Sequence, residues 1–129
     1  MLNIFTNLLT FGWLIGNVVP LIYDELHDIY TNKGINFNSL HHLDDLGLVT
    51  FSGISGFQRK GMPKIIQVSY FGDQTRIKFK GENDNFIDTG KVLLTKVGEQ
   101  LAPVCGPSPS NEFKQYVMGK WKEFGYVSS

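Results

Sequence analysis

The first 23 residues carry no charged side chain, so this stretch belongs either in a protein core or in a membrane. A membrane span needs about 20 nearly continuous apolar residues, but five Asn and Thr residues interrupt this stretch and Pro20 would break its last turn. A secretory signal needs a basic start and a small-residue cleavage site, and the stretch has neither. We therefore expect no membrane span and a buried helix over residues 3–16, with a membrane-associated helix as the alternative.

The spacing of apolar residues predicts two further helices in the first half of the chain. A helix is expected over Leu21–Thr31, because a proline just before it fits the first helical turn. A short helix over residues 38–46 follows, with Asn36 or Asn38 as its N-cap. Gly47 is expected to end this helix, since glycine readily adopts the left-handed conformation found there.

After Gly47 the pattern becomes typical of β-structure, because short segments rich in β-branched and aromatic residues alternate with polar turns. Gly72–Gln74 is a hairpin signal between two such segments. Ser52–Gly61 contains three glycines and no periodic apolar residues, so we expect a loop there. The expected strands cover residues 48–51, 64–71, 75–80, 86–88 and 91–94.

Two helices are expected to close the chain. Thr95 can cap a helix from Lys96 to about Val104, and Gly106–Ser110 contains two prolines that exclude helix. A final helix is expected over residues 111–124. The chain has 129 residues, of which 42% are hydrophobic, and this is enough for one domain with its own core. The uncharged start suggests that this domain is the C-terminal piece of a larger protein.

The formal net charge is zero, but the charges are unevenly distributed. Residues 1–50 carry five carboxylates and one lysine, a net charge of −4, whereas residues 51–80 carry six basic side chains and one carboxylate, a net charge of +5. The balance argues against binding of nucleic acid through overall charge, although it leaves a local basic patch open. Any contact with a polyanion should therefore involve the basic middle of the chain.

The candidate binding residues are the six basic side chains of that middle region. On the strand at 75–80 the basic residues share one face while Ile77 and Phe79 share the other, so one face is expected to be wet and the other buried. This face is either solvated, or a contact for an acidic protein surface, or a contact for nucleic acid. The full set is Arg59, Lys60, Lys64, Arg76, Lys78 and Lys80.

The final helix supplies a second candidate surface. Its aromatic residues recur at helical spacing, and the alternatives are that they pack in the core or that they form an exposed contact with a protein partner or a second copy. These candidate interaction residues are Phe113, Tyr116, Trp121 and Phe124.

Catalytic and metal-binding motifs are weak or missing. His41, His42 and Asp45 could supply two or three metal ligands, but the chain has no His-Glu-x-x-His run. Cys105 has no basic neighbour in sequence that would activate its thiol. The chain also lacks the glycine-rich phosphate loops and the Gly-x-Ser-x-Gly element. We therefore expect no enzyme, no cofactor and no metal.

Two segments resemble known families. Leu43–Val49 passes from a helix through a glycine into a strand, and Leu94–Leu101 contains Leu-Thr-x-x-Gly at the start of a helix. Both are similar to elements of winged-helix proteins of the marker-resistance-regulator kind. Over nearly its whole length the chain also resembles the C-terminal region of an uncharacterised family of bacterial proteins of unknown function, with Asn17–Pro20 and Gly34–Phe37 among the similar residues. These resemblances imply a scaffold and supply no catalytic residue.

We therefore expect a cytoplasmic α+β domain over residues 1–129, similar to a winged helix with an extended β-hairpin wing and an additional C-terminal helix. The favoured function is non-enzymatic, a protein–protein or interdomain contact. The alternative is a nucleic-acid-binding regulator that grips phosphates through the basic wing, because Asp44 and Asp45 on the helix over residues 38–46 would repel DNA. A metal-dependent hydrolase built on the histidines is a third hypothesis.

Overall fold

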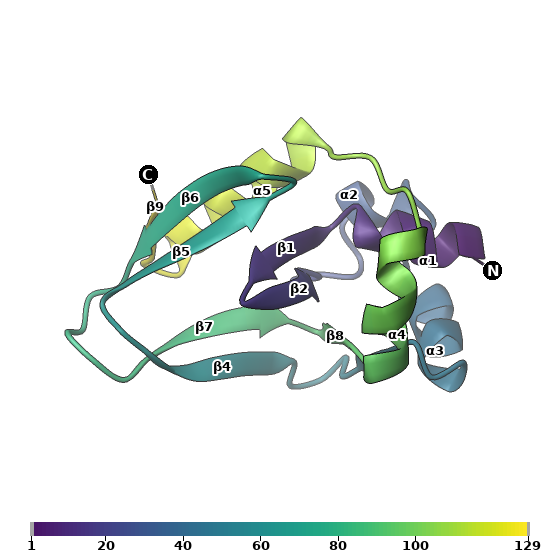
Figure 1. The fold of residues 1–129 in the computed structure, drawn as a ribbon, viewed down its shortest axis with the longest axis horizontal. Helices are drawn as coiled ribbons and strands as arrows, with labels where there is room; N and C mark the ends of the chain where they lie inside the picture. Colours follow the sequence, from purple (N-terminus) through teal and green to yellow (C-terminus); the bar gives the residue numbers. More distant parts are fainter. Residues whose placement is uncertain (1, 129) are drawn as a thin grey trace.

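The computed structural model describes residues 2–128 and folds them into helices and antiparallel strands (Figure 1). The α+β class predicted from the sequence is confirmed. In chain order the elements are α1 (Leu2–Leu9), β1 (Gly12–Ile15), β2 (Asn17–Pro20), α2 (Asp28–Thr31), α3 (Phe37–Asp45), β3 (Val49–Phe51), β4 (Phe57–Met62), β5 (Ile65–Tyr70), β6 (Asp73–Lys78), β7 (Asn85–Gly90), β8 (Val92–Leu94), α4 (Lys96–Leu101), the 3₁₀ turn η1 (Ala102–Val104), α5 (Asn111–Glu123) and β9 (Val127–Ser128).

The N-terminal stretch is half helix and half hairpin. α1 ends at Leu9, and β1 then pairs antiparallel with β2 along its whole length. Gly16 makes the turn between them at φ +80°, a conformation that glycine adopts without steric cost. The predicted helix over residues 3–16 is therefore right for α1 and wrong beyond it. In β1 the burial alternates, so that Trp13 is buried and Leu14 is half-exposed, as a strand requires.

The second predicted helix is also shorter than expected. Only α2 is helical, and Leu21 and Ile22 are completely buried in irregular chain before it. Glu25, which follows them, is buried and its Oε1 atom lies 2.8 Å from Nζ of Lys91. The apolar spacing over residues 21–31 therefore predicts a longer helix than the structure has, because side chains of an irregular segment can be buried from several sides.

α3 forms where the sequence predicts it. The side-chain oxygen of Asn36 accepts the Ser39 N–H at 2.9 Å, and Ser39 Oγ accepts the Asn36 N–H at 2.8 Å, which satisfies two free donors of the first turn. Leu40 and Leu43 are buried beneath the helix. Gly47 follows the helix at φ +78°, as predicted, and the chain then enters β3.

The region predicted as a loop over Ser52–Gly61 contains most of β4. This strand pairs with β7 through an irregular register, with shifts near Gln58 and between Arg59 and Met62. The prediction was wrong because β4 is polar and half-exposed, so its sequence lacks the apolar alternation that identifies most strands. Its stability comes from the partner strand rather than from its own composition.

Three sheets result from these pairings. The largest has the strand order β2-β1-β5-β6-β9, and β3-β8 and β4-β7 are two-stranded. Figure 1 shows the β5–β6 and β4–β7 ribbons diverging from one end of the molecule, with the β1–β2 hairpin lying between them. The ladder between β1 and β5 has a single register pair, Leu14 opposite Ser69.

The core lies between α5 and the largest sheet and is rich in aromatic rings. Trp121 of α5 packs edge-on against Trp13 of β1, with ring centroids 4.7 Å apart. Its Nε1 donates to the Tyr23 hydroxyl at 2.9 Å, and that hydroxyl donates to the Asp88 carbonyl at 2.8 Å. Burial raises the pKa of both Tyr23 and Tyr30, because a phenolate would lose its hydration there.

Candidate functional site

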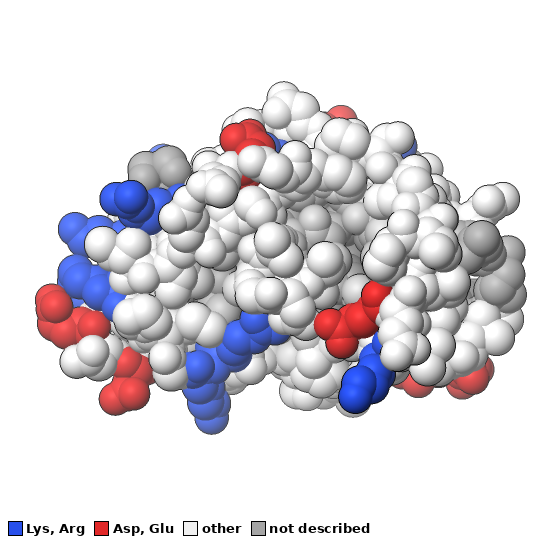
Figure 2. Space-filling model, in the orientation of Figure 1, with Lys and Arg blue, Asp and Glu red and all other residues white. Residues whose placement is uncertain are grey.

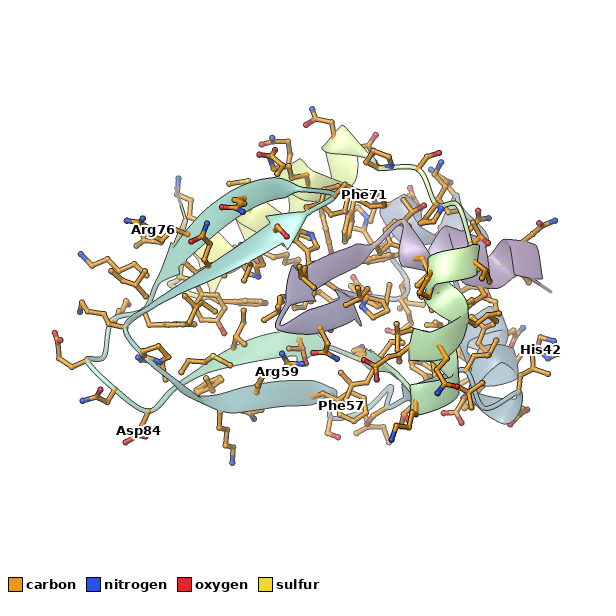
Figure 3. The ribbon with its side chains drawn as sticks, in the orientation of Figure 1. His42, Phe57, Arg59, Phe71, Arg76 and Asp84 are labelled. Atoms are coloured by element: carbon orange, nitrogen blue, oxygen red, sulfur yellow. The ribbon has the colours of Figure 1, made fainter. Side chains whose placement is uncertain are left out.

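Two of the predicted basic residues form an exposed pair on β6. Arg76 and Lys78 project to solvent while Ile77 between them is completely buried, so the predicted alternation is confirmed. Figure 3 shows Arg76 pointing away from the molecule, and Figure 2 shows basic atoms gathered at that end. Within residues 2–128, neither side chain forms a salt bridge. These cations are therefore available to an anionic partner.

The other predicted basic residues do not extend this pair into one surface. Arg59 lies on β4 and turns toward the β1–β2 hairpin, where it donates to the Ile15 carbonyl and, at 2.7 Å, to Oδ1 of Asn17. Lys64 pairs with Glu82 at 3.2 Å, and Lys60 is exposed.

The remaining residue of the set, Lys80, lies beside the C-terminal end of α5. A Cβ atom placed on Gly125 would lie 3.4 Å from Lys80 Nζ, and a cation there is favoured by the helix dipole. The six predicted basic residues are therefore divided among three structural contacts, the exposed pair on β6 and the separately exposed Lys60.

The aromatic residues of α5 mostly serve the core. Phe113 and Trp121 are completely buried, and Tyr116 is half-buried with its ring 5.8 Å from that of Tyr30. Phe124 is the most exposed of the four, with 40% of its surface in contact with solvent. Of the two alternatives, core packing describes Phe113 and Trp121, and the four residues do not form one exposed aromatic face.

The predicted metal and thiol candidates remain separate in the fold. His41, His42 and Asp45 are exposed on α3, and Figure 3 shows His42 pointing outward. Among residues 2–128 no group of three or more His, Cys, Asp or Glu side chains is placed to hold a metal ion. Cys105 is half-buried, and its Sγ lies 3.7 Å from the Leu101 carbonyl.

A cleft that the sequence did not predict opens between the β1–β2 hairpin, the β5–β6 turn and the α4–η1 segment. Its volume is about 540 Å³, within the range of about 300–1,000 Å³ typical of ligand sites. Figure 2 shows this hollow in a face that carries few charged atoms. The apolar side chains that line it include Leu9, Leu14, Val18, Phe71, Leu94 and Pro103.

Large apolar side chains in this cleft are exposed to solvent. Leu14 is 48% exposed, Phe71 is 45% exposed and Val18 is 36% exposed. All three line the same cleft, and Leu14 lies opposite Val18 in the β1–β2 pairing, so their exposed surfaces form one patch. Contiguous exposed apolar surface of this kind marks binding sites in water-soluble proteins.

Phe71 occupies a backbone conformation that aromatic residues rarely adopt. β5 and β6 are joined by the two-residue turn Phe71–Gly72, with φ values of +48° and +84°. Two positive φ values in a two-residue hairpin loop define a type I′ turn, in which Asn or Asp normally precedes Gly. An L-residue with a Cβ pays about 1–2 kcal/mol for this conformation. Figure 3 shows Phe71 at the tip of this ribbon, above β1.

A polar corner closes one side of the cleft. Asn17 at the start of β2 donates from Nδ2 to Oε2 of Glu99 on α4, at a long distance of 3.4 Å. The Oδ1 atom of Asn17 accepts from Arg59, so the orientation of its amide is fixed from both ends. The cleft therefore combines apolar walls with one carboxylate and one amide at its rim.

Comparison with protein-family models matches residues 23–118 to the family described as "Protein of unknown function (DUF2806)". The chain belongs to this family. No curated protein and no solved structure matches it. The resemblance to an uncharacterised family of unknown function is thus confirmed. No helix within residues 2–128 is long and apolar enough to cross a membrane.

Only some of the residues that line the cleft lie within the range that matches this family. Phe71, Glu99 and Pro103 lie inside the matched range, whereas the wall that carries Leu14 and Val18 lies before it. Sequence reasoning missed the cleft because its walls come from three distant segments. One signal was present: an aromatic residue directly before Gly72 at a hairpin turn.

Proposed function

We propose that this chain is a non-catalytic protein-interaction module that holds a segment of a partner protein in the cleft beside Phe71. The observation that carries the proposal is the exposed apolar surface of Leu14, Val18 and Phe71 on one opening of about 540 Å³. Covering this surface with a partner would remove apolar area from water, at about 25 cal/mol for each Å².

The conformation of Phe71 supports this proposal independently of the cleft volume. Asn at the same position would relieve the left-handed backbone, and the turn itself does not require an aromatic ring. Residues held in costly conformations cluster at sites of binding and catalysis. Phe71 therefore keeps a backbone conformation that costs folding free energy, while its ring supplies apolar surface to the cleft.

Site-specific photo-crosslinking in the native cells tests this function. A benzophenone side chain placed at Leu14 should give a discrete cross-linked product, and the same group at exposed Gln115 on α5 should not. Phe71→Asn should suppress the Leu14 product. A product of twice the chain mass would identify a second copy as the occupant, and the lack of any Phe71-dependent product would refute the proposal.

Binding of nucleic acid is a second candidate, favoured by the exposed pair Arg76 and Lys78. In a winged-helix arrangement α3 would approach the major groove, but its exposed face carries Asp45. A backbone contact through β6 is therefore the form this function would take, with affinity that falls as salt rises. Both cations lie away from the cleft lining, so the two candidate functions can be separated.

A mobility-shift assay with random duplex DNA at low salt tests this second candidate. The double variant Arg76→Glu with Lys78→Glu should abolish any shift, while Lys33→Glu, which removes an exposed cation outside β6, should not. Unchanged binding by the double variant, or no binding by the wild-type chain, would refute it.

A further inference from the structure

The cleft has one charged side chain among its described lining residues, Glu99 of α4. We infer that the partner segment carries a lysine or arginine between apolar side chains, and that this basic group binds the Glu99 carboxylate. The inference rests on the proposed function and names the chemistry of its ligand. Two observations support it: the negative charge of Glu99 at the rim, which has one contact with Asn17, and the apolar walls beside that charge.

Glu99 is exposed to solvent, and the chain itself supplies only part of its hydrogen bonding. Its Oε2 atom accepts one long hydrogen bond, 3.4 Å from Nδ2 of Asn17. Among residues 2–128, its Oε1 atom has no hydrogen bond and neither oxygen takes part in a salt bridge. A ligand that covers the apolar walls would also displace water from this carboxylate, and a charge that loses water needs an opposite charge or further donors.

Arg59 does not supply that opposite charge. Its guanidinium donates to the Ile15 carbonyl and to Oδ1 of Asn17, and Arg59 does not line the cleft. Its role is to fix the Asn17 amide so that Nδ2 faces Glu99. Lys96 lies one turn earlier on α4, is exposed and forms no salt bridge with Glu99. The carboxylate is therefore oriented while its charge remains available.

The walls indicate how the rest of the segment would bind. Pro103 and Pro107 form part of one side and offer apolar surface without a backbone N–H. Leu14 and Val18 face the same opening with their side chains. Recognition would then depend on side-chain packing against the apolar walls and on an ion pair at the rim, since the proline wall cannot donate backbone hydrogen bonds to an added strand. A short segment with apolar residues on both sides of a basic residue satisfies these contacts.

Selection from a displayed library of random 12-residue peptides tests both the binding of apolar residues in the cleft and the binding of a basic residue by Glu99. The wild-type chain should enrich peptides with Lys or Arg flanked by apolar residues. Glu99→Gln should still enrich apolar residues and lose the basic position, because it keeps the shape of the side chain and removes its charge. Glu112→Gln, the same change on an exposed carboxylate of α5, is the matched control and should select the wild-type pattern.

The outcomes separate the inference from the proposed function. Apolar enrichment without a basic position, or a basic position that persists in Glu99→Gln, refutes the inference and leaves the cleft function standing. Enrichment that Phe71→Asn does not reduce, or no enrichment by the wild-type chain, refutes both. The Phe71→Asn variant suits this purpose because the change relieves the turn and should leave the fold intact.

Fluorescence anisotropy then measures the ion pair directly. The best enriched peptide is compared with the same peptide carrying norleucine in place of its basic residue. The wild-type chain should bind the norleucine peptide about two- to fivefold more weakly, and the ratio should fall toward one in Glu99→Gln. Raising the salt concentration should also reduce the ratio, since the rim is open to solvent. A ratio that is the same in both proteins would contradict the assignment of Glu99.

Discussion

Replacing Phe71 tests whether its left-handed backbone conformation costs folding free energy that another residue would recover. Phe71 has φ +48° and 45% of its surface is exposed, while its ring packs edge-on against that of Tyr70 at 4.8 Å. Two substitutions remove the ring. Phe71→Asn introduces a residue that tolerates the left-handed backbone, whereas Phe71→Ala leaves the backbone cost in place.

The expected free energies follow from these contacts. About half of the ring is buried, so its removal should cost about 1 kcal/mol of apolar burial. The lost contact with Tyr70 should cost a further 0.5–1.5 kcal/mol, approximately. Relief of the left-handed conformation should return about 1 kcal/mol in Phe71→Asn alone. We therefore expect Phe71→Ala to lose about 2 kcal/mol of unfolding free energy and Phe71→Asn to lose about 1 kcal/mol.

Urea denaturation followed by tryptophan fluorescence measures this difference, because Trp13 and Trp121 are both buried in the core. The two variants should have equal m-values, and Phe71→Asn should be the more stable by about 1 kcal/mol, or about 4 °C in Tm. Both should bind cleft peptides more weakly than the wild-type chain. If Phe71→Asn were no more stable than Phe71→Ala, the turn would hold no relievable strain and the argument from Phe71 would fail.

Two further predictions concern glycines within helices and the buried tyrosines. Gly98→Ala should destabilise the chain by about 3 kcal/mol or more, because its Cβ would lie 2.1 Å from the Leu48 carbonyl oxygen. Gly119→Ala should instead stabilise α5 by about 0.5–1 kcal/mol, because the added Cβ meets no atom within 4 Å. Thermal unfolding measures both changes. The raised pKa values of Tyr23 and Tyr30 mean that the unfolded chain loses these protons first, so stability should fall as the pH rises above about 10. Absorbance at 295 nm reports all five tyrosines, so the signals of Tyr23 and Tyr30 are obtained as the difference between the wild-type chain and the Tyr23→Phe and Tyr30→Phe variants. These signals should appear only as the chain unfolds, and their appearance in a still-folded chain would contradict this account.

The elements that could be predicted from the sequence are those whose signals are local. α3 was predicted because Asn36 caps its first turn and Gly47 ends it, and both act within a few residues of the helix. β6 was predicted because its basic and apolar residues alternate over one short segment. In each case residues close in sequence determine the structure, so no knowledge of distant contacts is needed.

The β1–β2 hairpin could not be predicted in the same way. Residues 3–16 have apolar spacing that fits a helix, and the strand conformation of the second half depends on Trp13 reaching Trp121 and Leu14 meeting Ser69. Both partners are more than 50 residues away in the chain. The cleft depends on the same distant packing, and so neither the cleft nor the pairing of Asn17 with Glu99 follows from local pattern.

The position of the family match bears on how the cleft can be tested. The match begins at residue 23, yet α1 and the β1–β2 hairpin before it supply one wall of the cleft. Deleting this segment would not isolate the binding role of that wall, because Phe5, Leu8 and Trp13 are completely buried in the shared core. Their loss would unfold the chain along with the cleft. Substitution of the half-exposed Leu14 changes the wall and leaves the buried side of the hairpin intact, so point variants rather than truncations can separate binding from folding.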